Sequence, residues 1–250
     1  MAFSTKKIIA GNWKMNGTRD FAWNLANALT DRFADMERPN FEMILCPPFT
    51  LLAEVAGMLE GSPIKLGAQD ISAHDDGAYT GEVSGSMLKD IGAKFALCGH
   101  SERRQYHGET NEVVREKAAA ALKHGITPII CIGETDEERT AGRALEVITA
   151  QFSDSLPEGA TAKNTIIAYE PVWAIGTGKS ATTADIVEVH AHIRTLAEKH
   201  MGDRSVSILY GGSVKPATAA ETLAIPDVDG VLVGGASLKP DDFWAIATAA

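Results

Sequence analysis

Short apolar runs rich in β-branched residues alternate along the chain with longer amphipathic stretches, and we count eight such runs. The runs predict β-strands at residues 7–11, 42–46, 64–68, 95–98, 127–132, 165–169, 206–210 and 230–233. Apolar spacing with the helical period predicts helices at 20–33, 51–59, 111–123, 145–152, 184–200, 218–223 and 241–247, and a shorter one at 86–91. Strands that alternate with helices indicate a parallel sheet whose crossover connections are helices.

Eight strand–helix units favour an α/β fold in which eight parallel strands form one closed (β/α)8 barrel. The alternative is an open doubly wound sheet, but no G-x-G-x-x-G pattern follows the first predicted strand. No Pro/Ser-rich linker or shift in composition divides the chain. We therefore expect residues 1–250 to form a single barrel domain.

The chain has 250 residues and a formal net charge of −10 at pH 7. Its lysines and arginines are scattered, which argues against binding to nucleic acid or to an anionic membrane surface. Cys46, Cys98 and Cys131 stand in apolar runs, so we expect buried thiols and a reducing compartment. The N-terminal apolar run is too short for a signal peptide, and no segment is long enough to cross a bilayer. These features predict a cytoplasmic location.

The segment 168–179 places a carboxylate, Glu170, at the end of a predicted strand. Pro171 fixes its own φ and favours an extended backbone at Glu170, so the position of the carboxylate is well defined. Bulky apolar residues follow, and Gly176-Thr177-Gly178 then supplies the backbone freedom that a moving segment needs. The pattern suggests a catalytic base beneath a closing loop at 171–179. An ordinary surface turn is the alternative.

Other polar residues and glycines also follow predicted strands, at the end of a barrel where active sites lie. They include Asn12 and Lys14 after the first strand, 99–102 after the fourth, 211–213 after the seventh and 234–235 after the eighth. Lys14 supplies positive charge that an acidic chain otherwise lacks, and Asn12 adds an orienting amide. The histidines other than His100 are not grouped in the sequence as metal ligands would be.

Six motifs occur in order along the chain. They are Gly11-Asn12-Trp13-Lys14, Cys98-Gly99-His100-Ser101-Glu102-Arg103-Arg104, Cys131-Ile132-Gly133-Glu134, Ala168-Tyr169-Glu170-Pro171-Val172-Trp173-Ala174-Ile175-Gly176-Thr177-Gly178, Tyr210-Gly211-Gly212-Ser213-Val214 and Leu232-Val233-Gly234-Gly235-Ala236-Ser237-Leu238. In sequence, order and spacing they closely resemble the triosephosphate isomerase family. The resemblance implies a TIM barrel and an isomerase of glycolysis and gluconeogenesis that interconverts dihydroxyacetone phosphate and D-glyceraldehyde 3-phosphate. It implies no cofactor and no metal.

The reaction of that family moves a proton between adjacent carbons through an enediolate, and one base can serve both carbons. The resemblance implies that Glu170 is this base and that His100 is the electrophile. We expect the closing loop to raise the basicity of Glu170 by expelling water. We expect His100 to be neutral because it precedes a helix for which Ser101 would be the N-cap.

Two glycine-rich segments after the last two strands favour phosphate binding by backbone amides. The expected substrate-binding residues are Asn12, Lys14, Gly176, Ser213, Gly234 and Gly235. By resemblance, Glu102 supports the site from a position beside Lys14. Glu134, Arg139 and Tyr169 stand where polar contacts between the closing loop and the barrel are expected.

The polar stretch 69–82 is too long for a simple turn between a strand and a helix. In the family this loop reaches into a second subunit, so the resemblance implies a homodimer. Thr80 would then approach Asn12 and Lys14 of the partner subunit, and Glu82 would lie near Arg103. A flexible surface loop is the alternative.

Two other functions remain open from the sequence. A Schiff-base aldolase that acts on a sugar phosphate would use Lys14 with a depressed pKa in an apolar site. A catalytically silent binder of phosphate metabolites would keep the barrel without the chemistry. The complete set Asn12, Lys14, His100 and Glu170 argues against a silent binder, which has no use for a base beneath a closing loop.

Overall fold

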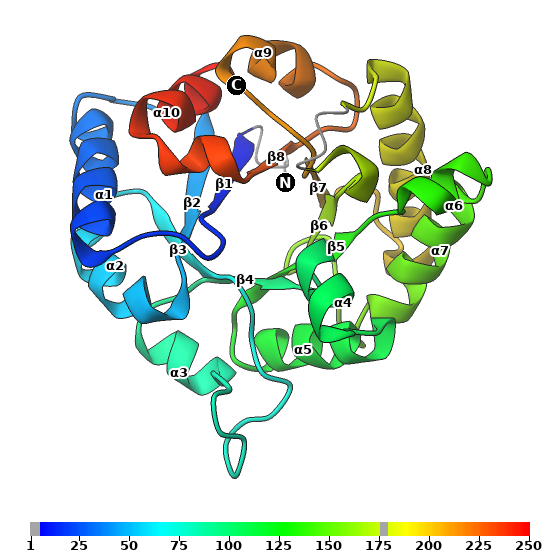
Figure 1. Ribbon diagram of the computed structural model, residues 1–250, viewed down its shortest axis with the longest axis horizontal. Helices are drawn as coiled ribbons and strands as arrows, with labels where there is room; N and C mark the ends of the chain where they lie inside the picture. The colour runs from blue at the N-terminus through cyan, green and yellow to red at the C-terminus, as the bar shows by residue number, and fades with distance from the viewer. Residues whose placement is uncertain (1–5, 176–179) are drawn as a thin grey trace.

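Eight parallel strands close into a barrel in the computed structural model, which describes residues 6–175 and 180–250 (Figure 1). The strands are β1 (Lys7–Asn12), β2 (Phe41–Cys46), β3 (Lys65–Ala68), β4 (Phe95–Cys98), β5 (Thr127–Ile132), β6 (Ile166–Tyr169), β7 (Ser207–Tyr210) and β8 (Gly230–Val233). Each strand pairs with the next along the chain, and β8 pairs with β1. The predicted barrel is confirmed, and every predicted strand boundary lies within one residue of the observed one.

Helices surround the barrel on its outer face (Figure 1). They are α1 (Arg19–Ala34), α2 (Leu52–Met58), α3 (Gly85–Asp90), α4 (Ser101–His107), α5 (Asn111–Lys123), α6 (Asp136–Thr140), α7 (Ala144–Ser155), α8 (Thr183–Met201), α9 (Pro216–Leu223) and α10 (Pro240–Thr248). Three 3₁₀ turns, η1 (Phe49–Leu51), η2 (Val172–Ala174) and η3 (Gly235–Leu238), lie at the carboxyl ends of β2, β6 and β8. Among the described helices, none combines the length and the apolar character needed to cross a membrane.

The apolar spacing predicts neither α4 nor α6. Only Ser101 is buried in α4, and no residue is buried in α6, so neither helix has an apolar face that would produce a periodic signal. Thr135 and Glu138 form a capping box at the start of α6. The T-x-x-E spacing is therefore the sequence signal that identifies this helix.

The barrel wall separates two groups of buried apolar side chains. A small group includes Ala10, Leu97, Ala168 and Leu209, and their neighbours along the strands belong to a much larger group that packs against the helices. Successive side chains of a strand point to opposite faces, so the small group fills the barrel interior and the large group fills the layer beneath the helices. Because the interior is packed, ligands must bind at the rim of the barrel.

The loop between β3 and α3 projects beyond the ring of helices, at the bottom of Figure 1. It has internal structure: the Ser72 N–H donates to the Val83 carbonyl oxygen at 2.8 Å, and the rings of His74 and Tyr79 stack with centroids 3.7 Å apart. The tip is exposed to solvent.

Candidate active site

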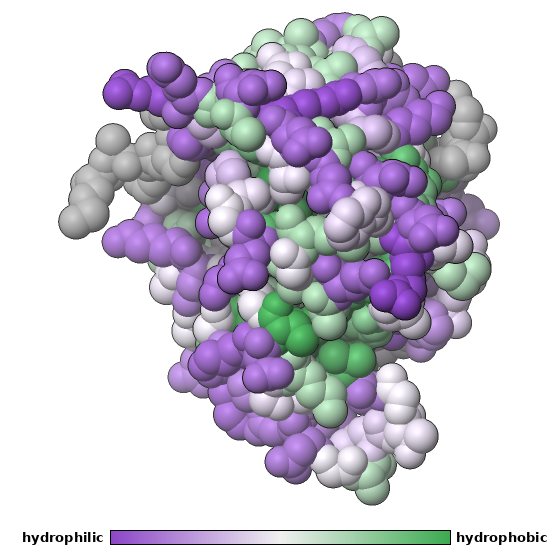
Figure 2. All heavy atoms as spheres, turned by 90° about the vertical axis from the view of Figure 1, so that its left-hand side faces the viewer, coloured by the Kyte–Doolittle hydropathy of each residue, from purple (hydrophilic) through white to green (hydrophobic). Residues whose placement is uncertain are grey.

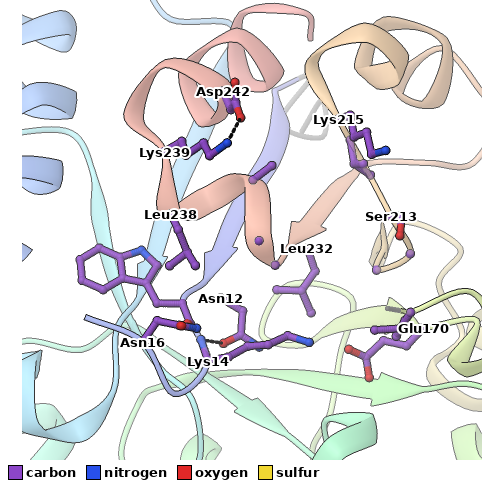
Figure 3. Close-up of a pocket in the computed structure, with 18 of the residues that line it drawn as sticks. Asn12, Lys14, Asn16, Glu170, Ser213, Lys215, Leu232, Leu238, Lys239 and Asp242 are labelled. Carbon is purple, nitrogen blue, oxygen red and sulfur yellow. Dashed lines mark hydrogen bonds and ion pairs between the residues drawn. The ribbon is translucent and has the colours of Figure 1, made fainter. Parts of the chain in front are cut away.

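A cavity of about 570 Å³ lies at the carboxyl end of the barrel, where β1, β4, β6, β7 and β8 end. Seven of the predicted site residues line it, namely Asn12, Lys14, His100, Glu170, Ser213, Gly234 and Gly235. Figure 3 shows Lys14 and Glu170 pointing toward each other from opposite sides of this cavity. Gly176, which the sequence predicts for phosphate binding, lies outside the described residues with the rest of 176–179.

Sequence reasoning missed part of the cavity wall. The additional lining residues include Asn16, Lys215, Leu232, Leu238, Lys239 and Asp242. Leu232 lies on β8 two residues before Gly234, so the alternation of side chains along a strand was the signal that could have found it. Lys215 and Lys239 are the N-cap residues of α9 and α10, which brings both to the rim.

Lys14 is held by three side chains. Its backbone φ of 53° is in the left-handed region, and its N–H donates to Asn12 Oδ1 at 2.9 Å. Gln69 Nε2 donates to its carbonyl oxygen at 2.8 Å. Its ammonium Nζ lies 2.5 Å from Glu102 Oε1, which places Glu102 beside Lys14 as the sequence resemblance implied. Gln69 was not predicted for this role, although it begins the polar stretch after β3.

Glu170 is buried, with 2% of its surface exposed. Its N–H donates to the carbonyl oxygen of Ile132 at 2.8 Å, which ties the strand end to β5. Its carboxylate accepts a hydrogen bond from the Ser101 N–H at 2.8 Å and lies 2.9 Å from His100 Nε2. The predicted base and the predicted electrophile are therefore in direct contact.

This contact shifts the pKa values of His100 and Glu170 in opposite directions. Burial favours a lower pKa for His100, but the adjacent Glu170 carboxylate outweighs burial and raises the pKa above its ordinary value. Burial favours a higher pKa for Glu170, but His100 and the Ser101 N–H lower it. The neutral ring of His100, and a Glu170 carboxylate made more basic when the loop closes, stay predictions for the site with substrate bound.

The N-cap of α4 is His100, which corrects the assignment of Ser101. His100 has φ −49° and ψ 144°, outside the helical region, and its Nδ1 accepts a hydrogen bond from the Glu102 N–H at 3.3 Å. Ser101 is the first residue of the helix, and its N–H is free to bind the Glu170 carboxylate. An N-terminal helix amide that binds an anion is the expected electrostatic arrangement.

Glu134 gathers the polar contacts expected between the closing loop and the barrel. Its side chain is fully buried, and its Oε1 accepts hydrogen bonds from Tyr169 Oη at 3.1 Å, Trp173 Nε1 at 2.8 Å and Arg139 at 3.0 Å. The guanidinium of Arg139 also lies 5.1 Å from the Trp173 ring centroid. One buried carboxylate thus connects β5, β6, α6 and the first turn of the closing loop.

The glycine-rich ends of β7 and β8 line the cavity together with Lys14. A Cβ on Gly234 would lie 3.4 Å from Lys14 Cε. Ser213 Oγ donates to the carbonyl oxygen of Ala174 at 3.2 Å, so this predicted phosphate ligand also contacts the start of the closing loop.

The residues predicted for a dimer interface lie at two places. Thr80 and Glu82 are exposed on the projecting loop. Arg103 lies on α4 and pairs within the chain with Asp70 at 3.0 Å and Glu109 at 2.5 Å. Lys117 joins the same two carboxylates, which makes a buried ion network at the base of the loop.

The cysteines Cys46, Cys98 and Cys131 are free and buried, as the sequence predicted. Burial raises the pKa of the Cys46 thiol to about 12. Within 6–175 and 180–250, His, Cys, Asp and Glu side chains form no group of three that could hold a metal ion.

Three comparisons with known proteins agree. A family model described as triosephosphate isomerase matches residues 7–250. A curated triosephosphate isomerase from Granulibacter bethesdensis is 51% identical over 98% of this chain and 99% of its own length. One from Hyphomonas neptunium is 50% identical over 96% of this chain and 97% of its own. The crystal structure of triosephosphate isomerase from Bartonella henselae covers 98% of both chains with a TM-score of 0.89 and 45% identity.

Proposed function

The chain belongs to the triosephosphate isomerase family, and we propose that Glu170 is the base of its reaction, with His100 and Lys14 stabilising the intermediate. The enzyme interconverts dihydroxyacetone phosphate and D-glyceraldehyde 3-phosphate, a step of glycolysis. One observation carries the assignment of roles. Asn12, Lys14, His100 and Glu170 line a single cavity together with the glycine-rich ends of β7 and β8.

The reaction requires the Glu170 carboxylate to turn from His100 toward the substrate carbon. A substrate seated between the two side chains ends their 2.9 Å contact. His100 then loses the anion that raises its pKa, and burial favours the neutral ring. A neutral His100 can donate a hydrogen bond to a substrate oxygen, while Glu170 takes the proton from one carbon and returns it to the next.

Lys14 and Asn12 complete the electrostatic stabilisation. The Lys14 ammonium points across the cavity toward Glu170 (Figure 3), where charge develops on the enediolate. Asn12 holds the backbone of Lys14 through its Oδ1. Phosphate would be bound by Ser213, Gly234 and Gly235, with Gly176 joining when the loop 171–179 closes. The fixed binding energy of the phosphate can then drive that closure.

The Schiff-base alternative fits the lysine poorly. An amine must be neutral to attack a carbonyl. Lys14 Nζ lies 2.5 Å from the Glu102 carboxylate, the geometry of an ion pair. Borohydride added with substrate distinguishes the two reactions, because only an aldolase leaves a covalently reduced adduct on the lysine.

A direct test combines one assay and one variant. Purified protein with glyceraldehyde 3-phosphate, and with no added metal or cofactor, should form dihydroxyacetone phosphate. Glu170→Asp withdraws the carboxylate by one methylene and should lower kcat about 100-fold while KM changes much less. A Glu170→Asp enzyme with parental kcat would remove Glu170 from the role of base.

We also propose that the enzyme works as a homodimer in the cytoplasm and that its 250 residues act as one domain. The projecting loop 69–82 supports the dimer, because Thr80 and Glu82 stand exposed on it. Exposed apolar side chains on the described surface include Met15, Tyr79 and Met87. On the α1 and α2 side, Figure 2 shows apolar residues gathered just above the projecting loop. Three free, buried thiols support a reducing compartment.

A further inference from the structure

Gln151 on α7 reaches the end of β5 and binds both sides of one residue. Its Oε1 accepts a hydrogen bond from the Gly133 N–H at 2.7 Å, and its Nε2 donates to the Gly133 carbonyl oxygen at 3.1 Å. A side-chain amide that satisfies both backbone groups of one residue holds that residue in position and in orientation. Gly133 lies outside the ladder of β5, so these two bonds take the place of strand pairing.

Gly133 is packed directly against the backbone of Glu170. A Cβ at this position would stand 1.7 Å from the Glu170 carbonyl oxygen. No other residue fits here unless one of the two backbone segments moves. On one side of Gly133, the Ile132 carbonyl oxygen accepts from the Glu170 N–H at 2.8 Å. On the other side, the Glu134 carbonyl oxygen accepts from the Val172 N–H at 3.1 Å. Gly133 therefore lies at the centre of the backbone contact that fixes the positions of Glu170 and of the start of the closing loop.

Packing alone does not hold Gly133 and its neighbouring backbone in place. A second cavity of about 670 Å³ borders it, and its lining includes Gly133, Gln151, Glu170, Val172 and Trp173. A backbone segment beside a cavity can shift into that space if its hydrogen bonds are removed. The Gln151 amide is the group that spans from the helix layer to this segment.

We propose that Gln151 is a positioning residue for the isomerase reaction, one that fixes Glu170 and Val172, at the start of the closing loop, through Gly133. The proposal rests on the role of Glu170 stated under Proposed function. Gln151 does not touch the substrate cavity, so its effect must appear in the placement of the carboxylate and not in phosphate binding. A displacement of about 1 Å at a reacting group is enough to cost about 100-fold in rate.

The test compares two glutamines that line the same second cavity. Gln151→Leu removes both hydrogen bonds and nearly preserves volume, whereas Gln105→Leu, at an exposed position on α4, is the matched control. We expect kcat of Gln151→Leu to fall between about 10- and 100-fold with KM within about threefold of the parent. Gln105→Leu should keep the parental kcat. Gln151→Glu retains the acceptor for the Gly133 N–H but sets a carboxylate oxygen against the Gly133 carbonyl oxygen, so its kcat should also fall below the parent.

The affinities for two ligands distinguish a displaced Glu170 from a loss of folded protein. Phosphoglycolate carries a carboxylate as well as a phosphate, so its binding should depend on the placement of Glu170 beside the phosphate site, whereas inorganic phosphate should depend on the phosphate site alone. We expect Gln151→Leu to weaken phosphoglycolate binding about 10-fold or more and to leave inorganic phosphate affinity unchanged in calorimetric titrations. Gln151→Glu gives the same comparison should Gln151→Leu fold poorly.

Three results would decide against the proposal. They are parental kcat in Gln151→Leu, parental kcat in Gln151→Glu, and equal losses of affinity for phosphoglycolate and phosphate. Glu170→Gln is measured in parallel, so that the positioning role of Gln151 and the role of Glu170 as base are tested separately. If Glu170→Gln is active, the assignment of the base fails; if it is inactive while Gln151→Leu is fully active, only the positioning role fails.

Discussion

At the scale of single residues, the site maintains Lys14 in a backbone conformation that residues with a Cβ seldom adopt. A φ of 53° costs free energy in a lysine. Asn12 and Gln69 offset this cost with hydrogen bonds to its N–H and its carbonyl oxygen. The same turn directs the side chain over Gly234. The placement of the ammonium thus depends on backbone geometry as well as on the Glu102 pair.

Replacement of Lys14 by Met removes the charge and keeps the side-chain length. We expect kcat/KM to fall about 100- to 1,000-fold, because a fixed cation facing the developing oxyanion is lost. Lys163→Met is the matched control: Lys163 is exposed in the loop before β6, at the opposite end of the barrel, and its loss should leave kcat/KM unchanged. Steady-state kinetics on both variants gives the comparison. Similar values for the two variants would show that the Lys14 charge is not needed.

The sequence identified the chemical groups of the site but not their pairwise contacts. Strand ends and motifs locate Asn12, Lys14, His100 and Glu170 because parallel strands bring their carboxyl ends to one rim. The contact between Glu170 and His100 depends on side-chain rotamers and on a close approach of the loops after β4 and β6, which no local pattern encodes. The sequence therefore gives no signal for the opposite pKa shifts that this contact produces in the two groups.

At the scale of elements, α8 carries a buried histidine against the barrel. His190 is fully buried, and its Nδ1 lies 3.0 Å from the carbonyl oxygen of Asp227. The ring meets Tyr169 edge-on, with centroids 5.9 Å apart. Burial lowers the pKa of His190 to about 4. The helix is therefore docked through a ring that must stay neutral.

This docking predicts a loss of stability in acid. An unfolded histidine has a pKa of about 6.5, so between pH 6.5 and 4 the unfolded chain binds more protons than the folded one. The free energy of unfolding should thus fall as the pH drops through this range, by about 3 kcal/mol from this residue. Urea unfolding at several pH values measures the slope.

His190→Gln should flatten that slope, and His200→Gln, at an exposed position on the same helix, is the control. The comparison concerns the slope and not the absolute stability, because loss of the buried ring also changes the packing beneath α8. Parallel slopes in His190→Gln and the parent would exclude His190 as the source.

Strands were easier to predict than helices in this chain. Buried parallel strands are short continuous apolar runs, so their limits are visible in the sequence. The helices α4 and α6 have few or no buried residues and owe their existence to capping and to the loops they connect. Both border the second cavity, which Glu170 also lines. The two helices beside this cavity are therefore ones that the apolar pattern does not reveal.

At the scale of the whole molecule, the projecting loop links the proposed dimer to the active site. Its base carries Gln69, which binds Lys14, and Asp70, which joins the ion network with Arg103 and Lys117. A partner subunit packed on the loop tip would therefore contact the loop whose base holds Lys14. On this basis we expect loss of the proposed dimer to lower activity.

Thr80→Arg tests the dimer. The parent should have a solution mass near twice the 26.6 kDa of the chain, and a charged side chain at the loop tip should shift the variant toward the monomer and lower kcat. Glu158→Arg, at an exposed position in the loop after α7, should remain dimeric and active. Light scattering measures the masses. A monomeric parent enzyme would overturn the proposal.

Closure of the barrel also governs how the chain can be made. β1 leaves the ribosome first, but its second neighbour, β8 (Gly230–Val233), is among the last segments to be synthesised. Until then β1 and the most recently made strand each present an unpaired row of N–H and carbonyl groups, on which strands of other chains can add. We therefore expect nascent chains on one messenger RNA to be exposed to mutual aggregation until β8 emerges, and shielding of these edges to improve the yield of folded protein.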